Sequence, residues 1–127
     1  MDPKRRILIV DDDRAMVTLL SALVRSAGYD VLVAGDSLQG YTQALKERPA
    51  LIVTDMQMPA GGGKQLLQRL AANDRSREIP IVVVTGSVDP EYEKEILQAG
   101  AKRVVFKPVD HAQFLAALDA VLGETPT

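Results

Sequence analysis

Residues 51–55 have the sequence LIVTD, and this stretch decides the fold of a chain of 127 residues. Its first four residues favour a buried strand, and a carboxylate stands where that strand ends. A loop with three consecutive glycines, residues 61–63, follows before any helical pattern begins. In an open parallel sheet, ligands bind in the crevice at the carboxyl ends of the strands. Asp55 is therefore the candidate chemical centre of the domain.

Four other short apolar runs alternate with helical patterns along the chain. We expect strands at residues 7–10, 31–33, 51–54, 81–84 and 104–106. We expect helices over residues 14–27, from a cap at residue 36 or 37 up to residue 49, and over 64–72, 90–99 and 110–123. Such alternation is typical of an α/β fold, in which helices cover both faces of a parallel sheet. The chain is expected to form a single domain, residues 1–127, with a core over about residues 5–123.

Three expectations concern single residues of these helices. In the second helix, the apolar spacing predicts that Leu38, Tyr41 and Leu45 face inward. Gly40 lies between them and lowers the stability of that helix by about 1 kcal/mol relative to Ala. In the fourth helix, Tyr92 is expected to be a surface residue.

The composition excludes several classes of protein. No apolar run approaches the roughly 20 residues needed to cross a bilayer, so we expect no membrane span. The chain has no cysteine and one histidine, which excludes disulfides, thiol catalysis and metal sites built from several histidines. The net charge of -2 gives no reason to expect direct binding of nucleic acid.

The N-terminal segment does not resemble a secretion signal. Three basic residues, Lys4, Arg5 and Arg6, precede the apolar run 7–10, but that run is too short for a signal-peptide core and leads into three acids. We therefore expect a cytoplasmic protein.

Four of the five expected strands deliver polar groups to the same edge of the sheet. These groups are Asp11 with Asp12, then Asp55, Thr85 and Lys107. Carboxylates that lie close together repel one another and raise each other's pKa, and a divalent cation removes that conflict. Mg²⁺ suits such a site because it prefers hard oxygen ligands. Carboxylates, a hard metal, a lysine and a hydroxyl suit phosphoryl transfer, in which a carboxylate can itself be the nucleophile.

Each of these residues also has a simpler structural explanation. Asp12 or Asp13 could cap the first helix, and Asp55 could start an Asx turn. Thr85 could bond to the local backbone, and Lys107 could be a solvated surface residue. Their coincidence at one edge of the sheet favours a site over these separate explanations.

The chain resembles the receiver domain of bacterial two-component response regulators. The motifs that carry this resemblance are ILIVDD at 7–12, DMQMP at 55–59 with Gly63 behind it, VVTG at 83–86, AGA at 99–101 and FKP at 106–108. They span essentially the whole chain. The resemblance implies a flavodoxin-like, doubly wound, five-stranded parallel sheet in the order 2-1-3-4-5, with five helices.

The resemblance also implies a function for each matching residue. Asp55 would accept a phosphoryl group from the phosphohistidine of a sensor histidine kinase or of a phosphotransfer protein. Lys107 would hold one phosphoryl oxygen, Thr85 would bond to another, and the peptide bond between Lys107 and Pro108 would be cis, which only X-Pro bonds adopt readily.

The same resemblance implies a Mg²⁺ site. Asp12 would bind the ion directly and Asp11 mainly through water. Asp55 and the backbone carbonyl of Gln57 would complete the protein ligands.

The family resemblance further implies a regulatory domain that catalyses only its own phosphorylation and dephosphorylation. Phosphorylation would change the face formed by the fourth helix, the fifth strand and the fifth helix, and thereby control a downstream protein or a fused output domain. The sequence leaves open whether the chain acts alone or is one domain of a longer protein.

Two features of the sequence depart from the family pattern. Val104 stands three residues before Lys107, where the family usually has a Tyr or Phe that moves together with the threonine. We therefore predict that signalling does not use the usual threonine–aromatic coupling, although Phe106 shares the strand face of Val104. The glycines at 61–63 predict a mobile loop or a tolerant turn beside Asp55.

Two alternatives to a phosphorylated receiver domain stay open. A phosphohydrolase of the haloacid-dehalogenase type would use Asp11 as nucleophile and Asp13 as acid and base, but Ala15 lacks the Thr or Val of that motif and the chain has no room for a cap domain. A receiver-like domain could also work without phosphorylation, although the complete set of Asp11, Asp12, Asp55, Thr85 and Lys107 argues against this.

Overall fold

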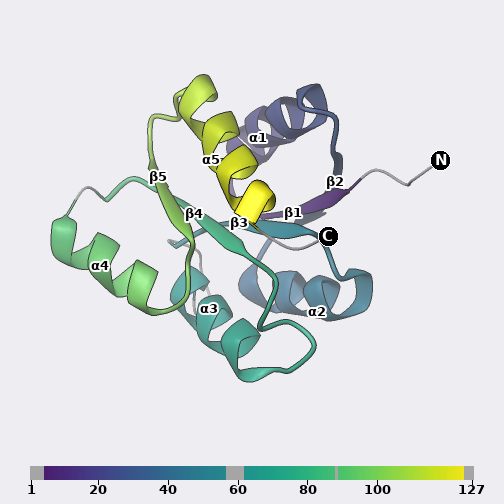
Figure 1. The fold of residues 1–127 in the computed structure, drawn as a ribbon, viewed down its shortest axis with the longest axis vertical. Coiled ribbons are helices and arrows are strands. Elements are labelled where there is room, and N and C mark those ends of the chain that lie inside the picture. Colours follow the sequence, from purple (N-terminus) through teal and green to yellow (C-terminus); the bar gives the residue numbers. More distant parts are fainter. Residues whose placement is uncertain (1–4, 57–61, 88, 125–127) are drawn as a thin grey trace.

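The computed structural model describes residues 5–56, 62–87 and 89–124, and it contains a central parallel sheet covered by helices (Figure 1). In chain order the elements are β1 (Arg6–Val10), α1 (Arg14–Ser26), β2 (Asp30–Ala34), α2 (Ser37–Glu47), β3 (Leu51–Asp55), α3 (Gly62–Ala72), β4 (Ile81–Thr85), α4 (Pro90–Gln98), β5 (Arg103–Phe106) and α5 (His111–Glu124). The strands are ordered β2-β1-β3-β4-β5 and pair in parallel. The expected fold class and strand order are therefore confirmed.

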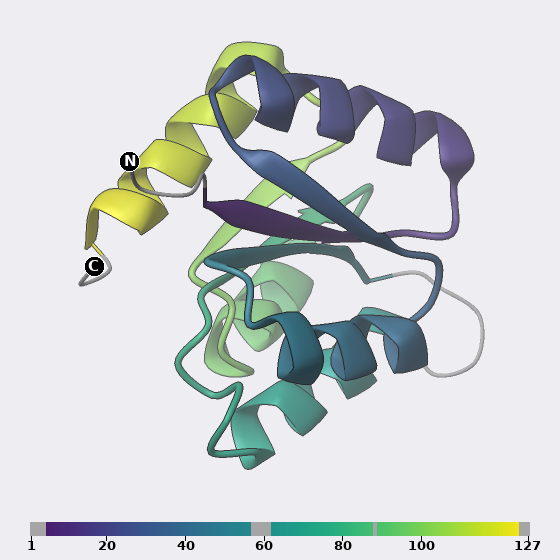
Figure 2. The same cartoon turned by 90° about the vertical axis from the view of Figure 1, so that its right-hand side faces the viewer.

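The helices form one layer on each side of the sheet. Figure 2 shows α1 and α5 on one side, and α2, α3 and α4 on the other. Because side chains alternate along a strand, Ile7 and Ile9 of β1 pack in the cluster under α1 and α5, whereas Leu8 and Val10 pack in the cluster under α2, α3 and α4. A strand covered on both faces has no solvent-facing position, which is why its sequence is continuously apolar.

The strand register brings the expected polar residues to one edge. Val10 pairs with Thr54, so Asp11 and Asp55 follow adjacent positions of β1 and β3. Thr85 pairs with Phe106, and the amide of Lys107 donates a 2.8 Å hydrogen bond to the carbonyl of Thr85. The carboxyl ends of β1, β3, β4 and β5 therefore meet, as parallel pairing requires.

Aspartate side chains cap the first turns of α1, α2 and α4. Asp13 caps α1, and its carboxylate accepts hydrogen bonds from the amides of Ala15 and Met16 at 2.9 and 3.3 Å. Of the two residues considered for this cap, it is therefore Asp13 that serves. Asp36 caps α2, and Asp89 caps α4.

Several details of the helices differ from expectation. α1 ends at Ser26 and α4 at Gln98, each one residue early, and α3 begins at Gly62 rather than at residue 64. Leu38 does not face inward: it is 62% exposed, because α2 buries Ser37, Gly40 and Ala44 instead.

Gly40 has a packing role that outweighs its low helix propensity. A Cβ atom at this position would lie 2.8 Å from Cγ2 of Val10. The missing side chain therefore lets α2 approach β1 closely. Among the described residues, no helix has both the length and the apolar character that crossing a membrane requires.

Candidate metal and phosphoryl-transfer site

Three carboxylates converge at the carboxyl edge of the sheet. Asp11 and Asp12 follow β1, Asp55 ends β3, and one oxygen of each lies within 4.8 Å of the others. Asp11 and Asp55 are buried, whereas Asp12 is exposed. The structure thus brings together the three acids that the sequence proposed as metal ligands.

Asp11 carries the feature that best tests whether a cation fits. Its Oδ1 accepts a 2.9 Å hydrogen bond from the amide of Asp13, but its Oδ2 is buried and has no hydrogen-bond partner in the described part of the chain. Burial raises the pKa of Asp11, the bond from Asp13 opposes that shift, and the negative charge of Asp55 adds to it. A buried acceptor without a partner is costly, and a hard cation would satisfy it. The residues therefore fit Mg²⁺.

Lys107 places a positive charge beside Asp55. Its Nζ lies 3.3 Å from Oδ2 of Asp55, and the side chains of these residues are 25% and 7% exposed. The peptide bond from Lys107 to Pro108 is cis, as the family resemblance implied. Because the pair is largely shielded from water, its charges interact more strongly than a surface ion pair.

Thr85 is fully buried at the end of β4. Its Oγ1 accepts a 3.2 Å hydrogen bond from the amide of Ser87, so the expected local backbone bond exists. A hydroxyl that accepts in this bond keeps its own proton for donation. The structural and the functional interpretation of Thr85 are therefore compatible.

The glycines that start α3 are required by contact with the site. A Cβ atom on Gly63 would lie 2.3 Å from the backbone oxygen of Asp55, and one on Gly62 would lie 2.9 Å from that of Met56. Gly62 also has φ +62°, a conformation that favours glycine. The interpretation as a tolerant turn is wrong for these two residues. Gly61, the expected mobile loop and the carbonyl of Gln57 lie outside the described residues, so the proposed ligand role of Gln57 stays a prediction.

Sequence reasoning missed the role of Thr54. Its side chain is buried, and its hydroxyl donates a 3.0 Å hydrogen bond to the backbone carbonyl of Asp55, the oxygen against which Gly63 packs. A polar residue in an otherwise apolar strand was the available signal. Thr54 and Gly63 together hold the backbone of Asp55.

Tyr92 also differs from its expected role as a surface residue. It is half-buried and packs against the cluster under α2, α3 and α4, as does Val104. Phe106 is half-buried and belongs to neither apolar cluster. The spacing of Tyr92, Ile96 and Ala99 along one face of α4 could have indicated this burial.

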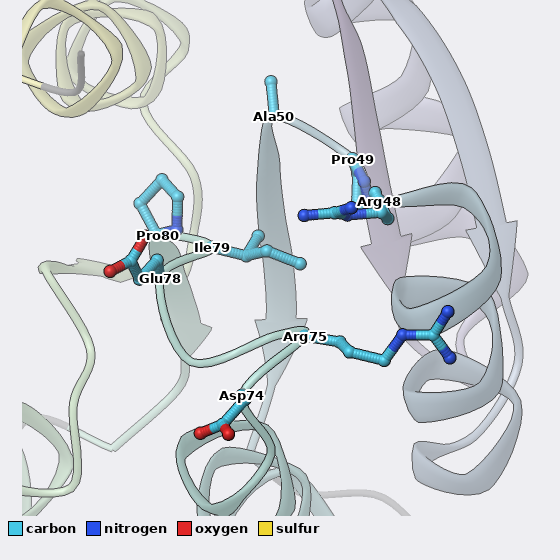
Figure 3. A pocket seen from close by; sticks show the side chains of 8 residues that line it. All are labelled: Arg48, Pro49, Ala50, Asp74, Arg75, Glu78, Ile79 and Pro80. Carbon is cyan, nitrogen blue, oxygen red and sulfur yellow. The ribbon is translucent and has the colours of Figure 1, made fainter. Parts of the chain in front are cut away.

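A hollow of about 520 Å³ lies at the end of the sheet opposite the carboxylates, before β3 and β4 (Figure 3). It is lined by Arg48, Pro49, Ala50, Asp74, Arg75, Glu78, Ile79 and Pro80. None of these residues belongs to the carboxylate site. Figure 3 shows its charged side chains spread around the hollow rather than aimed at one point, so its size alone does not make it a candidate site.

The chain is similar to curated regulatory proteins over most of its length. It is 35% identical to the DNA-binding dual master transcriptional regulator RpaA of Synechocystis sp., over 94% of this chain and 50% of the relative. It is 28% identical to the polar-differentiation response regulator DivK of Brucella anthropi, over 94% of this chain and 98% of the relative. The chain thus spans about half the length of RpaA and nearly all of DivK.

Solved structures show the same fold. The receiver domain of the sensor histidine kinase PA1611 from Pseudomonas aeruginosa, with a magnesium ion coordinated in its active-site cleft, has a TM-score of 0.88 and 27% identity, covering 96% of this chain and 100% of that one. The chemotaxis protein CheY4 of Vibrio cholerae has a TM-score of 0.87 and 27% identity, covering 94% and 99%.

The family model for the response regulator receiver domain matches residues 7–119. This match gives no support to the phosphohydrolase alternative, and the structure shows the carboxylate of Asp13 engaged in capping α1. The chain therefore belongs to the response regulator receiver domains, which are phosphoacceptor signalling domains.

Proposed function

We propose that Asp55 is the phosphoacceptor of this receiver domain. The observation that supports this most directly is its position: a buried carboxylate at a strand end, 3.3 Å from the ammonium of Lys107 and beside Asp11 and Asp12. Asp11 and Asp12 are alternative carboxylates, but Asp55 is the one whose oxygen faces the lysine.

Each residue of the site has a separate role in phosphoryl transfer. A carboxylate oxygen of Asp55 attacks the phosphorus of a donor phosphohistidine; the new O–P bond forms while the N–P bond breaks and leaves its electron pair on the imidazole nitrogen. Lys107 offsets the negative charge on one phosphoryl oxygen, and the hydroxyl of Thr85 donates to another.

Asp11, Asp12 and Asp55, with the carbonyl of Gln57, would hold Mg²⁺. When bound there, the ion supplies positive charge that offsets the charge of the carboxylates and of the phosphoryl oxygens. The unpaired Oδ2 of Asp11 is the observation that supports this ligand set.

The partners and the output are part of the proposal. The donor is a sensor histidine kinase or a phosphotransfer protein in the cytoplasm, and the domain catalyses only its own phosphorylation and dephosphorylation. The face formed by α4, β5 and α5 transmits the change to a downstream protein or to an output domain outside this chain. Since the chain matches half of RpaA but almost all of DivK, both arrangements occur among its relatives.

Mass spectrometry after treatment with acetyl phosphate and Mg²⁺ tests the phosphoacceptor. We expect one phosphoryl group on the peptide that contains Asp55, and none in the Asp55→Asn variant. Asp36→Asn is the matched control, because Asn caps a helix about as well as Asp and position 36 lies outside the carboxylate cluster. Label on Asp11 would overturn the proposal in favour of the phosphohydrolase.

A binding experiment tests whether phosphorylation matters for output. The protein is immobilised with and without phosphodonor, and the bound partners are compared. Equal recovery of every partner in both states, with Asp55 phosphorylated, would favour a domain that works unphosphorylated.

A further inference from the structure

Tyr92 connects the surroundings of Asp55 to helix α4. The ring packs against the apolar cluster that contains Met56, the residue directly after Asp55. Tyr92 also borders a small hollow between the start of α3 and the inner face of α4, lined by Met56, Lys64, Tyr92, Glu95, Ile96 and Ala99. Tyr92, a residue of α4, and Met56, the residue after β3, therefore line the same hollow.

The charge of Asp55 reaches the phenol group of Tyr92. Burial raises the pKa of Tyr92, the negative charge of Asp55 raises it further, and Glu95 adds a smaller contribution. The phenol is neutral near pH 7, so it senses this field through its O–H dipole. A change in the charge carried by Asp55 therefore changes the electric field at a side chain that lines the same hollow as Met56, the residue after Asp55.

Helix α4 has a small buried surface that Tyr92 can influence. Ile96 is its single fully buried residue, whereas α1 buries three residues and α3 buries five. Tyr92 and Ala99 flank Ile96 on the inner face as half-buried neighbours. The contact between α4 and α3 through Lys64 and Glu95 spans 3.8 Å at exposed positions, which contributes little to stability. Tyr92 is thus one of the few residues that pack α4 against the rest of the domain.

Within the part of the chain that the structure describes, no other aromatic residue combines these properties. Tyr29 and Phe114 pack on the opposite face of the sheet, and Tyr41 accepts a 2.9 Å hydrogen bond from Asn73 at the far end of α3. Phe106 lies outside both clusters and has no hydroxyl. Tyr92 is therefore the aromatic residue placed to connect Asp55 with α4.

We propose that Tyr92 is the positioning residue through which the charge state of Asp55 sets the position of α4. The inference rests on the phosphoacceptor role proposed for Asp55. A phosphoryl group carries up to about two negative charges and three strong acceptor oxygens. These draw the phenol O–H toward Asp55, the ring leaves part of its packing against Ile96, and α4 moves with it.

Fluorine NMR on protein labelled with 3-fluorotyrosine tests the first step. The three tyrosines give three resonances, each assigned by its Tyr→Phe variant. After addition of Mg²⁺ and beryllofluoride, a mimic of the aspartyl phosphate, we expect the resonance of Tyr92 to shift and those of Tyr29 and Tyr41 to stay. In Asp55→Asn none should move. A Tyr92 resonance that does not respond in the wild-type protein would overturn the proposal.

Hydrogen exchange of the α4 amides tests the second step. We expect the wild-type protein to change its exchange in α4 when Asp55 is phosphorylated. Tyr92→Leu should lose this response, and Tyr92→Phe, which keeps the ring and its packing, should reduce it. Tyr41→Phe and Phe106→Leu are controls that should retain it. An unchanged α4 response in both Tyr92 variants, or its loss in Phe106→Leu, would contradict the proposal.

Intact mass measured on the same samples separates this inference from the proposed function. If wild-type protein gains no phosphoryl group on Asp55, the phosphoacceptor proposal fails and this one fails with it. If every variant is phosphorylated on Asp55 but α4 behaves alike in all of them, only the role of Tyr92 is refuted.

Discussion

The two ends of the sheet both carry charged residues, but they hold them differently. At the carboxyl end, Asp11 and Asp55 are buried, and Lys107 lies 3.3 Å from Asp55. At the amino end, the hollow of about 520 Å³ is bordered by the exposed side chains of Arg48 and Arg75. Solvated charges cost little to hold and perturb each other little, whereas buried charges strongly affect their neighbours. The comparison shows that convergence and burial, rather than the size of a hollow, mark the site.

The largest effect is expected where the backbone of the site is most crowded. Gly63→Ala should destabilise the protein by about 3 kcal/mol, because a Cβ atom there would overlap the backbone oxygen of Asp55. Gly35→Ala is the matched control, since a Cβ atom at Gly35 has nothing within 4 Å. Urea unfolding measures both. Equal stability of the two variants would show that α3 can move away from Asp55 without cost.

The next effect concerns the charge beside Asp55. Lys107→Met keeps most of the side-chain volume but removes the ammonium, so phosphorylation by acetyl phosphate should slow by roughly 100-fold. Lys102→Met, at an exposed position, should leave the rate unchanged. Single-turnover kinetics followed by intact mass provide the rates. A Lys107 variant that reacts at the wild-type rate would remove the lysine from the site.

A smaller effect is expected from the raised pKa of Asp11 in metal-free protein. Between the ordinary pKa of 3.8 and its raised value, the folded state holds a proton that the unfolded state has lost. The contribution of Asp11 to the free energy of unfolding therefore falls as pH rises through this window and stays lower above it. With EDTA present, Asp11→Asn should be more stable than wild type at pH 7, and the difference should shrink toward pH 4.

Mg²⁺ provides the control for that experiment. It should stabilise the wild-type protein more than Asp11→Asn, because the variant has lost a charged ligand. Thermal unfolding of both proteins, once with EDTA and once with Mg²⁺, measures the difference in stability between them in each condition. Identical stabilisation of both proteins by Mg²⁺ would exclude Asp11 as a ligand.

The smallest effect lies at the amino end. Arg48 caps α2 with φ 48°, a left-handed conformation that costs free energy for any residue with a Cβ atom. Arg48→Gly should stabilise the protein by about 0.5 kcal/mol and leave phosphorylation of Asp55 unchanged. Arg75→Gly, a control outside that conformation, should bring no gain. A large loss of phosphorylation in the Arg48 variant would show that the two ends of the sheet are coupled.

Most of the architecture could be predicted because it depends on local patterns. Continuous apolar runs such as residues 7–10 form strands when both faces of the sheet are covered, and Asp13, Asp36 and Asp89 cap helices through bonds to amides two or three residues away. The alternation of strands and helices then permits only a few topologies of the parallel sheet. Helix ends were less accurate, because the last turn of a helix is set by weak competing bonds.

The site could be predicted in part for the same reason. Asp11, Asp55, Thr85 and Lys107 each follow or end a strand, so a parallel sheet necessarily brings them to one edge. The residues that end a strand can be recognised from the sequence pattern, so these four residues could be identified without any measured distance.

Only the tertiary structure decided what depends on contacts between distant segments. The sequence shows a glycine at position 63 and a tyrosine at position 92, but not that the first must pack on the carbonyl of Asp55 or that the second lines a hollow together with Met56. The unpaired oxygen of Asp11 likewise depends on burial by other elements. A linear pattern states which face a residue occupies, whereas close contacts and electric fields depend on how the faces are packed together. In this protein the sequence by itself determined the sheet and the members of its acidic edge, and the packing decided which groups lie against Asp11 and Asp55.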